Sequence, residues 1–336
     1  MARVVAATVG GIAEAAALLR SGEVCAFPTE TVYGLGANAL SDTAIQKIYQ
    51  IKGRPAFNPL IVHVENMALV RDLVTSIPSQ MTLLARRFWP GPLTLVLPRA
   101  PHVPARVSAG LDTIAVRVPA HPVALTLLHA AQLPICAPSA NRSEQVSPTR
   151  ADHVAKSLPD VPLILDGGPC EFGIESTVVD LTREHPVLLR PGAVAVSKLI
   201  PMLPNLVLPA SPGAFLSDAD AHHAPGQMKR HYAPRAPLLL FSDATALPLD
   251  RMPHPVGWLV IDPPPAGLMR PVDLVEPLPD DPALYAADLY AALHRLDDRQ
   301  VQAIVVQRPP QTLAWLAVLD RLERAAHGSE KAFDSR

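Results

Sequence analysis

Two cations separated by one glycine, Lys52 and Arg54, follow a predicted helix over residues 42–51. Pro55 favours extended backbone at the residue before it, so we expect both side chains to project on one side from irregular chain. Arginine offers a planar, bidentate donor and lysine a mobile point charge, a combination suited to phosphate oxygens. A Lys-Gly-Arg tripeptide by itself is usually a solvated turn, so a phosphate site needs support from its neighbours.

The neighbouring residues supply further polar groups. A turn with hydroxyls, a carboxylate and glycines precedes the helix, and an apolar strand with a histidine follows the cations; the polar members are Thr29, Glu30, Thr31, Tyr33, Asn58 and His63. Glycines at 34 and 36 allow backbone to come close to a ligand. Glu30 alone could be a surface carboxylate, and His63 a half-buried strand histidine. Their co-occurrence within residues 27–64 favours a binding site.

A second loop, PSANRS (138–143) extended to SPT (147–149), offers Ser139, Asn141 and Ser147. It follows a predicted strand at 135–137, and the ends of strands are the usual location of sites on open α/β sheets. The alternative is a capping loop for the helix at 150–157, which is the commoner role for such a sequence.

Two arginines lie on predicted strands. Arg117 stands between valines in the strand at 113–118, and Arg190 ends the strand at 187–190. An arginine within a strand is rarely buried without a partner, so Arg117 either faces solvent or meets an anion. Ser176 and Thr177 add hydroxyls on the strand at 174–180.

The composition excludes several classes of protein. The chain has 336 residues and a formal net charge of −2, which gives no global attraction to nucleic acid. Its 38 prolines break the apolar stretches, so that no 18-residue membrane span remains, and the N-terminal residues lack the apolar core of a signal peptide. Three cysteines, none spaced as CxxC, argue against a disulfide framework or a zinc knuckle and favour a cytoplasmic location. We predict no metal site formed by the protein itself.

The order of predicted elements indicates an α/β fold with a twisted, mixed, open sheet and flanking helices, because strands outnumber helices and the two do not alternate regularly. We predict a first domain over residues 1–205, a linker or lid over 206–236, and a smaller α/β domain over 237–336. The linker is rich in Pro, Ala, Ser and His. The last domain has no glycine-rich phosphate motif and is interpreted as regulatory or structural.

Several motifs together carry a resemblance to a known family. They are PTETVYGLG (28–36), KGRPAFNPLIVHV (52–64), WPGPLTLVL (89–97), PSAN with a later SPT (138–149), GIESTVVD (173–180), LLRPGAV (188–194) and PGQMKRHYAP (225–234). In these the chain resembles the YrdC/Sua5 family in its long, two-domain Sua5 form, whose second domain is Rossmann-like. The resemblance implies synthesis of threonylcarbamoyl-AMP and pyrophosphate from L-threonine, bicarbonate or CO2, and ATP accompanied by Mg2+.

The resemblance also implies a role for each candidate residue. The catalytic group beside the phosphates comprises Lys52, Arg54, Ser139 and Asn141. The ATP contacts comprise Arg54, Asn58, Thr113, Ser139, Ser147, Arg190 and Tyr232, the last closing over the site from the linker. The L-threonine contacts comprise Thr31, His63, Arg117 and one or both of Ser176 and Thr177.

The implied product feeds a separate tRNA threonylcarbamoyl transferase complex, which modifies adenosine 37 of tRNAs that read codons beginning with A. The near-neutral charge agrees with weak or no direct tRNA binding. One alternative is an RNA-binding translation factor, with a basic groove formed by Lys52, Arg54 and Arg117. The other is a hydrogenase-maturation carbamoyltransferase with a similar domain, against which the few scattered cysteines argue.

Overall fold

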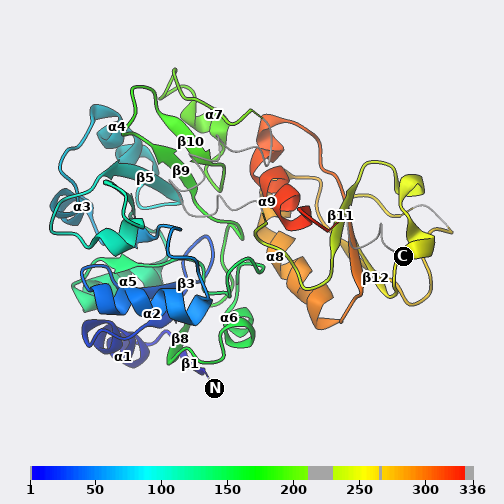
Figure 1. The fold of residues 1–336 in the computed structure, drawn as a ribbon, viewed down its shortest axis with the longest axis horizontal. Coiled ribbons are helices and arrows are strands. Elements are labelled where there is room, and N and C mark those ends of the chain that lie inside the picture. Colours follow the sequence, from blue (N-terminus) through cyan, green and yellow to red (C-terminus); the bar gives the residue numbers. More distant parts are fainter. Residues whose placement is uncertain (1, 211–229, 265–266, 330–336) are drawn as a thin grey trace.

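The computed structural model describes residues 2–210, 230–264 and 267–329, and within them the chain forms two sheets (Figure 1). The larger sheet has ten strands in the order β1-β8-β2-β3-β7-β4-β6-β5-β9-β10. Its strands are β1 Arg3–Ala6, β2 Cys25–Phe27, β3 Gly34–Asn38, β4 Ile61–His63, β5 Leu93–Pro98, β6 Thr113–Arg117, β7 Ile135–Cys136, β8 Leu163–Asp166, β9 Thr177–Asp180 and β10 Val187–Arg190.

Parallel and antiparallel pairs alternate irregularly across this sheet. For example, β4 runs parallel to β6 but antiparallel to β7, and β5 runs parallel to β9 but antiparallel to β6. The prediction of a mixed sheet is therefore confirmed. Since β4 and β6 are parallel neighbours in register, His63 lies directly beside Arg117.

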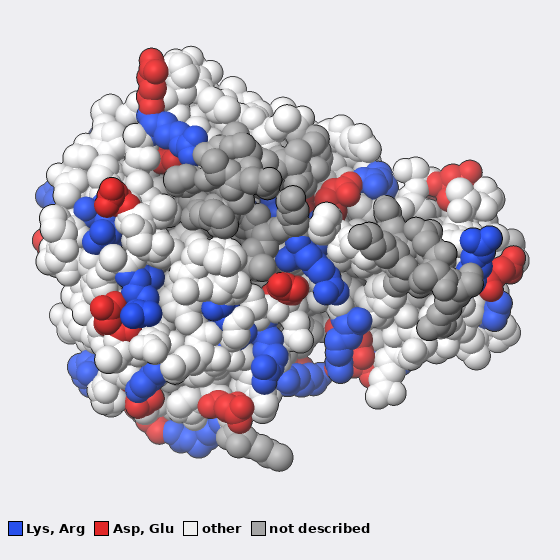
Figure 2. All heavy atoms as spheres, in the orientation of Figure 1, with Lys and Arg blue, Asp and Glu red and all other residues white. Residues whose placement is uncertain are grey.

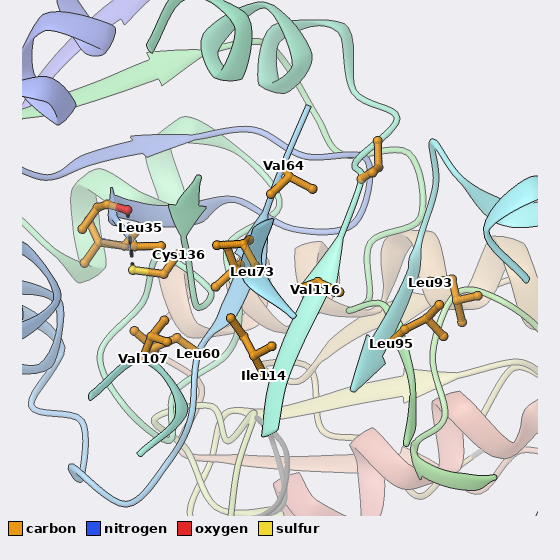
Figure 3. Packing of buried hydrophobic residues seen from close by; sticks show 14 of the residues in the cluster. Leu35, Leu60, Val64, Leu73, Leu93, Leu95, Val107, Ile114, Val116 and Cys136 are labelled. Carbon is orange, nitrogen blue, oxygen red and sulfur yellow. Dashed lines mark hydrogen bonds between the residues drawn. The ribbon is translucent and has the colours of Figure 1, made fainter. Parts of the chain in front are cut away.

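Helices cover both faces of the large sheet. They are α1 Val9–Arg20, α2 Asp42–Lys52, α3 Met67–Leu73, α4 Ser79–Phe88, α5 Pro122–Ala131, α6 Ala151–Ser157 and α7 Val196–Leu199. Residues of α1 and α5 form one apolar cluster with β2 and β8. The main apolar cluster joins residues of α2, α3 and α4 to residues on or beside the strands, such as Leu60, Val64, Leu95 and Val116 (Figure 3).

The second sheet has the order β11-β14-β12-β13, and its strands are all parallel. They are β11 Leu238–Phe241, β12 Val256–Val260, β13 Leu274–Pro277 and β14 Ala303–Gln307, with helices α8 Pro282–Asp298 and α9 Leu316–Ala326. A smaller C-terminal α/β unit is thus confirmed. The sequence did not predict β13, because this edge strand alternates half-buried and exposed positions and so lacks the continuous apolar run of a central strand.

The two sheets are joined by a shared apolar cluster. Residues of α8 and α9 pack there with Val32, Val146, Ile174 and Tyr232, which come from the first sheet's loops and from the end of the predicted linker. Residues 211–229 of that linker, including the start of PGQMKRHYAP, lie outside the described residues. No helix in the described part of the chain is long and apolar enough to cross a membrane.

Candidate active site

A cavity lies beside the ends of β4 and β6, and Tyr232 is part of its lining. Its lining includes Thr29, Thr31, Val32, Gly34, Arg54, Ile61, His63, Arg117, Ala137, Pro138, Ser139, Glu175, Ser176, Arg190, His231 and Tyr232. The free volume is about 40 Å3, room for about three waters.

Arg117 is buried and ion-paired with Glu30. The Nη2 atom of Arg117 lies 2.6 Å from Oε1 of Glu30, and both side chains are 3% exposed. Arg117 also donates from Nη1 to the Thr31 hydroxyl and from Nε to the carbonyl of Gly91. Burial alone would raise the pKa of the Glu30 carboxyl, but Arg117 outweighs it and the pKa is lowered. Of the two alternatives for Arg117, facing solvent or meeting an anion, the structure shows the second, and Glu30 is not a surface carboxylate.

His63 stands next to this pair as a neutral imidazole. Burial lowers the pKa of His63 from 6.5 to about 3, and the positive charge of Arg117 lowers it further than Glu30 raises it. Its Nδ1 atom has no hydrogen-bond partner in the described residues. A buried nitrogen in this condition is suited to a polar group of a ligand.

Arg54 lines another part of the cavity, and Lys52 lies behind this part, bonded to the lining residue Ser139. Ser41 caps α2, its hydroxyl accepting from the amide of Ala44, and the helix ends at Lys52 before Gly53 in the left-handed region, φ 60°. Lys52 Nζ donates to the carbonyls of Ser139, at 2.5 Å, and of Asn141. The backbone bond from Ser143 to the Lys52 carbonyl ties the same two segments together. This contact brings the two predicted loops into one site.

Arg54 donates from Nη2 to Oδ1 of Asn58 at 2.6 Å and to the carbonyl of Pro59 at 2.9 Å. Burial lowers the pKa of Arg54 to about 10, and burial together with Arg54 holds the pKa of Lys52 well below its usual range. These two cations contact carbonyl and amide oxygens only, within the described chain. Buried charge without a counter-charge is costly, which favours an anionic ligand here.

Arg190 and Ser176 form a third part of the lining. Arg190 donates from Nε to the carbonyl of Ser176 and from Nη2 to its hydroxyl, which also bonds to Thr94. Thr177 is the next strand residue and so points the other way. Its hydroxyl is held by the backbone of Val194.

Glu175 links the cavity to the C-terminal unit, although no site role was predicted for it. Its carboxylate accepts from Ser147 at 2.6 Å, from Tyr290 on α8 at 3.0 Å and from Arg321 on α9 at 2.8 Å. Although burial alone raises the pKa of Glu175, Arg321 and the other donors lower it. Two of these partners are more than a hundred residues away in the chain, a pairing that no local pattern indicates.

Tyr232 is fully buried, and its backbone adopts φ 60°, in the left-handed region that bulky residues avoid. Its ring packs on Tyr290, and the guanidinium of Arg321 lies 5.0 Å from the ring centre. Its hydroxyl has no hydrogen-bond partner in the described residues. Strain of about 1–3 kcal/mol is typical of such positions at functional sites.

The cavity collects most of the predicted residues, but not all. Those that line it are Arg54, Ser139, Arg190, Tyr232, Thr31, His63, Arg117 and Ser176. Four predicted residues lie behind the lining: Lys52, Asn58, Asn141 and Ser147. Three of them bond to residues of the lining, Lys52 to Ser139, Asn58 to Arg54 and Ser147 to Glu175. Thr113, at the start of β6, and Thr177 do not line it. Glu175 and His231 line it without having been predicted, and Thr29, which was named only as a polar member of the first loop, lines it as well.

The described residues contain no group of three or more His, Cys, Asp or Glu side chains placed to hold a metal ion. The oxygens near Lys52 and Arg54 are neutral carbonyl and amide groups. A Mg2+ ion, which prefers carboxylate, water and phosphate oxygens, would be held here by a nucleotide's phosphates.

Comparison with known families identifies the chain. The family model Sua5_yciO_yrdC, described as telomere recombination, matches residues 17–192, more than half of the chain. The chain belongs to the Sua5/YciO/YrdC family. A second model, Sua5_C, described as the C-terminal domain of threonylcarbamoyl-AMP synthase, matches residues 196–327. The family resemblance inferred from the motifs is therefore confirmed.

Similar members of the family cover nearly the whole chain. Threonylcarbamoyl-AMP synthase of Bacillus subtilis is 43% identical over 332 residues, 94% of this chain and 93% of the relative. That of Pyrococcus abyssi is 40% identical over 321 residues, 93% of both. The crystal structure of P. abyssi Sua5 complexed with L-threonine superposes with a TM-score of 0.84 at 39% identity, covering 94% of each chain. The α/β architecture with its second domain is that of Sua5.

Proposed function

We propose that this chain is an L-threonylcarbamoyl-AMP synthase, which forms threonylcarbamoyl-AMP and pyrophosphate from L-threonine, bicarbonate or CO2, and Mg2+-bound ATP. The observation that carries the proposal is one cavity lined by Arg54, Ser139 and Arg190 together with Thr31, His63 and Arg117. The names of the two relatives, and the L-threonine bound to P. abyssi Sua5, support it.

The chemistry needs no covalent intermediate on the protein. The amine of threonine attacks the carbon of CO2 and loses a proton, and an oxygen of the resulting N-carboxylate then attacks the α-phosphorus of ATP, from which pyrophosphate leaves. Burial raises the pKa of the Cys25 and Cys136 thiols to about 12, so neither is a thiolate nucleophile at neutral pH. Catalysis then consists of positioning and charge stabilisation.

The ATP end would be the side of Lys52 and Arg54. These cations would bind the triphosphate with Mg2+ and stabilise the charge that develops on departing pyrophosphate. Ser139 and Asn141 would lie beside the phosphates, and Asn58, Thr113, Ser147 and Arg190 would contact the rest of ATP. Lys52 and Arg54 would exchange carbonyl and amide oxygens for phosphate oxygens, which are stronger acceptors.

The threonine end would be the side of Arg117. Its guanidinium would bind the amino acid's carboxylate, while Thr31, neutral His63 and Ser176 would contact the remaining polar atoms. Thr177 would contribute only indirectly, through its place in β9, because its hydroxyl donates to the carbonyl of Val194. Tyr232 would close over the mixed anhydride and exclude water, which would otherwise hydrolyse it.

The product would leave for a separate transferase complex that modifies adenosine 37 of tRNAs reading ANN codons, in the cytoplasm. Lysines, arginines and acidic side chains are intermingled on the face seen in Figure 2. Such a surface supports weak or no direct tRNA binding.

Pyrophosphate release from ATP and Mg2+ tests this proposal, with threonine, bicarbonate and tRNA omitted or added in turn. We expect release that requires both small substrates and is indifferent to tRNA. No release, together with salt-sensitive tRNA binding, would instead support the RNA-binding alternative.

A further inference from the structure

Behind the cavity, next to the lining residue Arg117, lies a buried carboxylate, Glu30, for which the proposed reaction gives no role. The Glu30 residue is 2% exposed, and its ion pair with Arg117 lies at the threonine end. The two groups are 2.6 Å apart, so the carboxylate neutralises the guanidinium directly. Arg117 and backbone amides together lower the pKa of the Glu30 carboxyl despite its burial, so Glu30 carries a negative charge beside Arg117.

The neighbouring hydroxyls have a fixed direction. Thr29 donates its single hydroxyl proton to the carbonyl of Val32 at 2.7 Å, so in its 2.8 Å bond with Thr31 it must accept. Thr31 is therefore the donor to Thr29, and it accepts from Arg117 at 3.0 Å. A hydroxyl oxygen has two acceptor positions, so Thr31 has one left for a ligand's N–H.

The two ends of the cavity consequently differ in net charge. Lys52 and Arg54 contact only neutral oxygens among the described residues, whereas the charge of Arg117 is balanced by Glu30. The first end attracts anions. At the second end the positive donor in the lining, Arg117, has a negative partner directly beside it, and this pair of opposite charges is the complement of a zwitterion.

A role for Glu30 as a proton acceptor from the amine is disfavoured. Arg117 lowers the pKa of Glu30 from its ordinary value despite burial, whereas an α-amino group is a much stronger base, with a pKa of about 8. Proton transfer from the ammonium group to Glu30 would therefore be unfavourable. Glu30 therefore acts through its charge.

We infer that Glu30 is a specificity-determining residue, which makes the Arg117 end of the cavity selective for a zwitterionic α-amino acid and confines bicarbonate and phosphate groups to the Lys52 and Arg54 end. This inference rests on the proposed placement of the amino acid beside Arg117. Without Glu30, both ends would be positive and the anionic substrates would compete for the amino-acid position.

Calorimetric titration of the full chain with three ligands tests the inference. They are L-threonine, 3-hydroxybutyrate, which lacks the amine, and L-threoninol, which lacks the carboxylate. We expect the wild type to bind threonine at least about tenfold more tightly than either analogue, from loss of one charge-assisted contact. In Glu30→Gln the preference over 3-hydroxybutyrate falls toward one, and phosphate begins to compete with threonine.

Two further variants control the experiment. Glu30→Asp keeps the charge and should keep the preference, and Glu171→Gln, an exposed carboxylate, should behave as the wild type. A uniform loss for all three ligands in Glu30→Gln would overturn the inference, because it would indicate a structural role alone. If Glu30→Gln does not fold, the wild type and Glu30→Asp decide: equal binding of threonine and 3-hydroxybutyrate by either overturns it.

Failure of the proposed function is distinguished by a separate measurement. A wild type that prefers threonine over 3-hydroxybutyrate but releases no pyrophosphate with threonine and bicarbonate would retain the zwitterion site and lose the synthase activity. Pyrophosphate release without any preference among the three ligands would support the synthase activity and overturn the inference about Glu30.

Discussion

The two ends of the cavity bury positive charge in different ways. Arg117 is neutralised by Glu30 at 2.6 Å, whereas Lys52 and Arg54 are surrounded by neutral oxygens among the described residues, with lowered pKa values. A neutralised cation is stable before any ligand binds, but an unneutralised one is destabilising until an anion arrives. The comparison indicates that one end is prepared for a ligand without net charge and the other for a polyanion.

The largest expected effect is on stability, with opposite outcomes at the two ends. Glu30→Gln leaves Arg117 buried without a counter-charge and should lower the free energy of unfolding by about 3–5 kcal/mol. Lys52→Met removes an unneutralised buried charge and should leave that free energy unchanged or raise it. Urea denaturation at pH 7 measures both.

The pH dependence of the free energy of unfolding should show the same contrast between the two ends, through the titration of Lys52. Its folded pKa lies below the unfolded value of 10.5, so the unfolded chain binds more protons between these values, and stability rises with pH there. Lys52→Met should abolish that rise. Equal losses of stability in Glu30→Gln and Lys52→Met would contradict the comparison.

The next effect is on turnover. Lys52→Ala and Arg54→Ala should each remove about 2–4 kcal/mol of transition-state stabilisation, as loss of a preorganised charge donor does. The value of kcat/KM for pyrophosphate release measures this loss. Lys47→Ala is the matched control, since Lys47 lies on the same helix and pairs with Glu23 near the surface. Wild-type turnover in either Lys52→Ala or Arg54→Ala would show that the substituted residue does not stabilise the triphosphate in the transition state.

A smaller effect concerns His63 at the neutral end. Its pKa is about 3 when folded and 6.5 when unfolded, so only the unfolded chain takes up a proton between these values. Its contribution to stability is complete above pH 6.5 and decreases as the pH falls, by roughly 2 kcal/mol at pH 5. His63→Gln should show a correspondingly shallower loss on acidification. Identical slopes for the two proteins would mean that His63 titrates normally.

The smallest effect concerns Tyr232, which lines the same cavity. Tyr232→Ala should leave ATP binding largely intact but raise the release of AMP without product by a few-fold, because water reaches the adenylate. Tyr232→Phe keeps the ring and serves as the control. Unchanged AMP release in Tyr232→Ala would show that the ring does not shield the intermediate.

Local patterns predicted much of this architecture. The helix ending at Lys52, the strands carrying His63 and Arg117, and the loop with Ser139 are all where periodicity and turn residues indicated. Strand register then places His63 beside Arg117. What the sequence could not show is which groups neutralise one another. Glu30 is 87 positions from Arg117, and Glu175 is 146 from Arg321, so both pairs depend on the tertiary fold.

The most direct measurement is the fate of labelled carbon. The purified chain would be incubated with ATP, Mg2+, L-threonine and 13C-bicarbonate, and the nucleotide product identified by mass spectrometry. We predict an adenylate that contains threonine and one 13C atom, formed with one equivalent of pyrophosphate and absent when threonine is omitted. An adenylate of threonine without the labelled carbon, or pyrophosphate release with no adenylate even under rapid quenching, would contradict the proposed reaction.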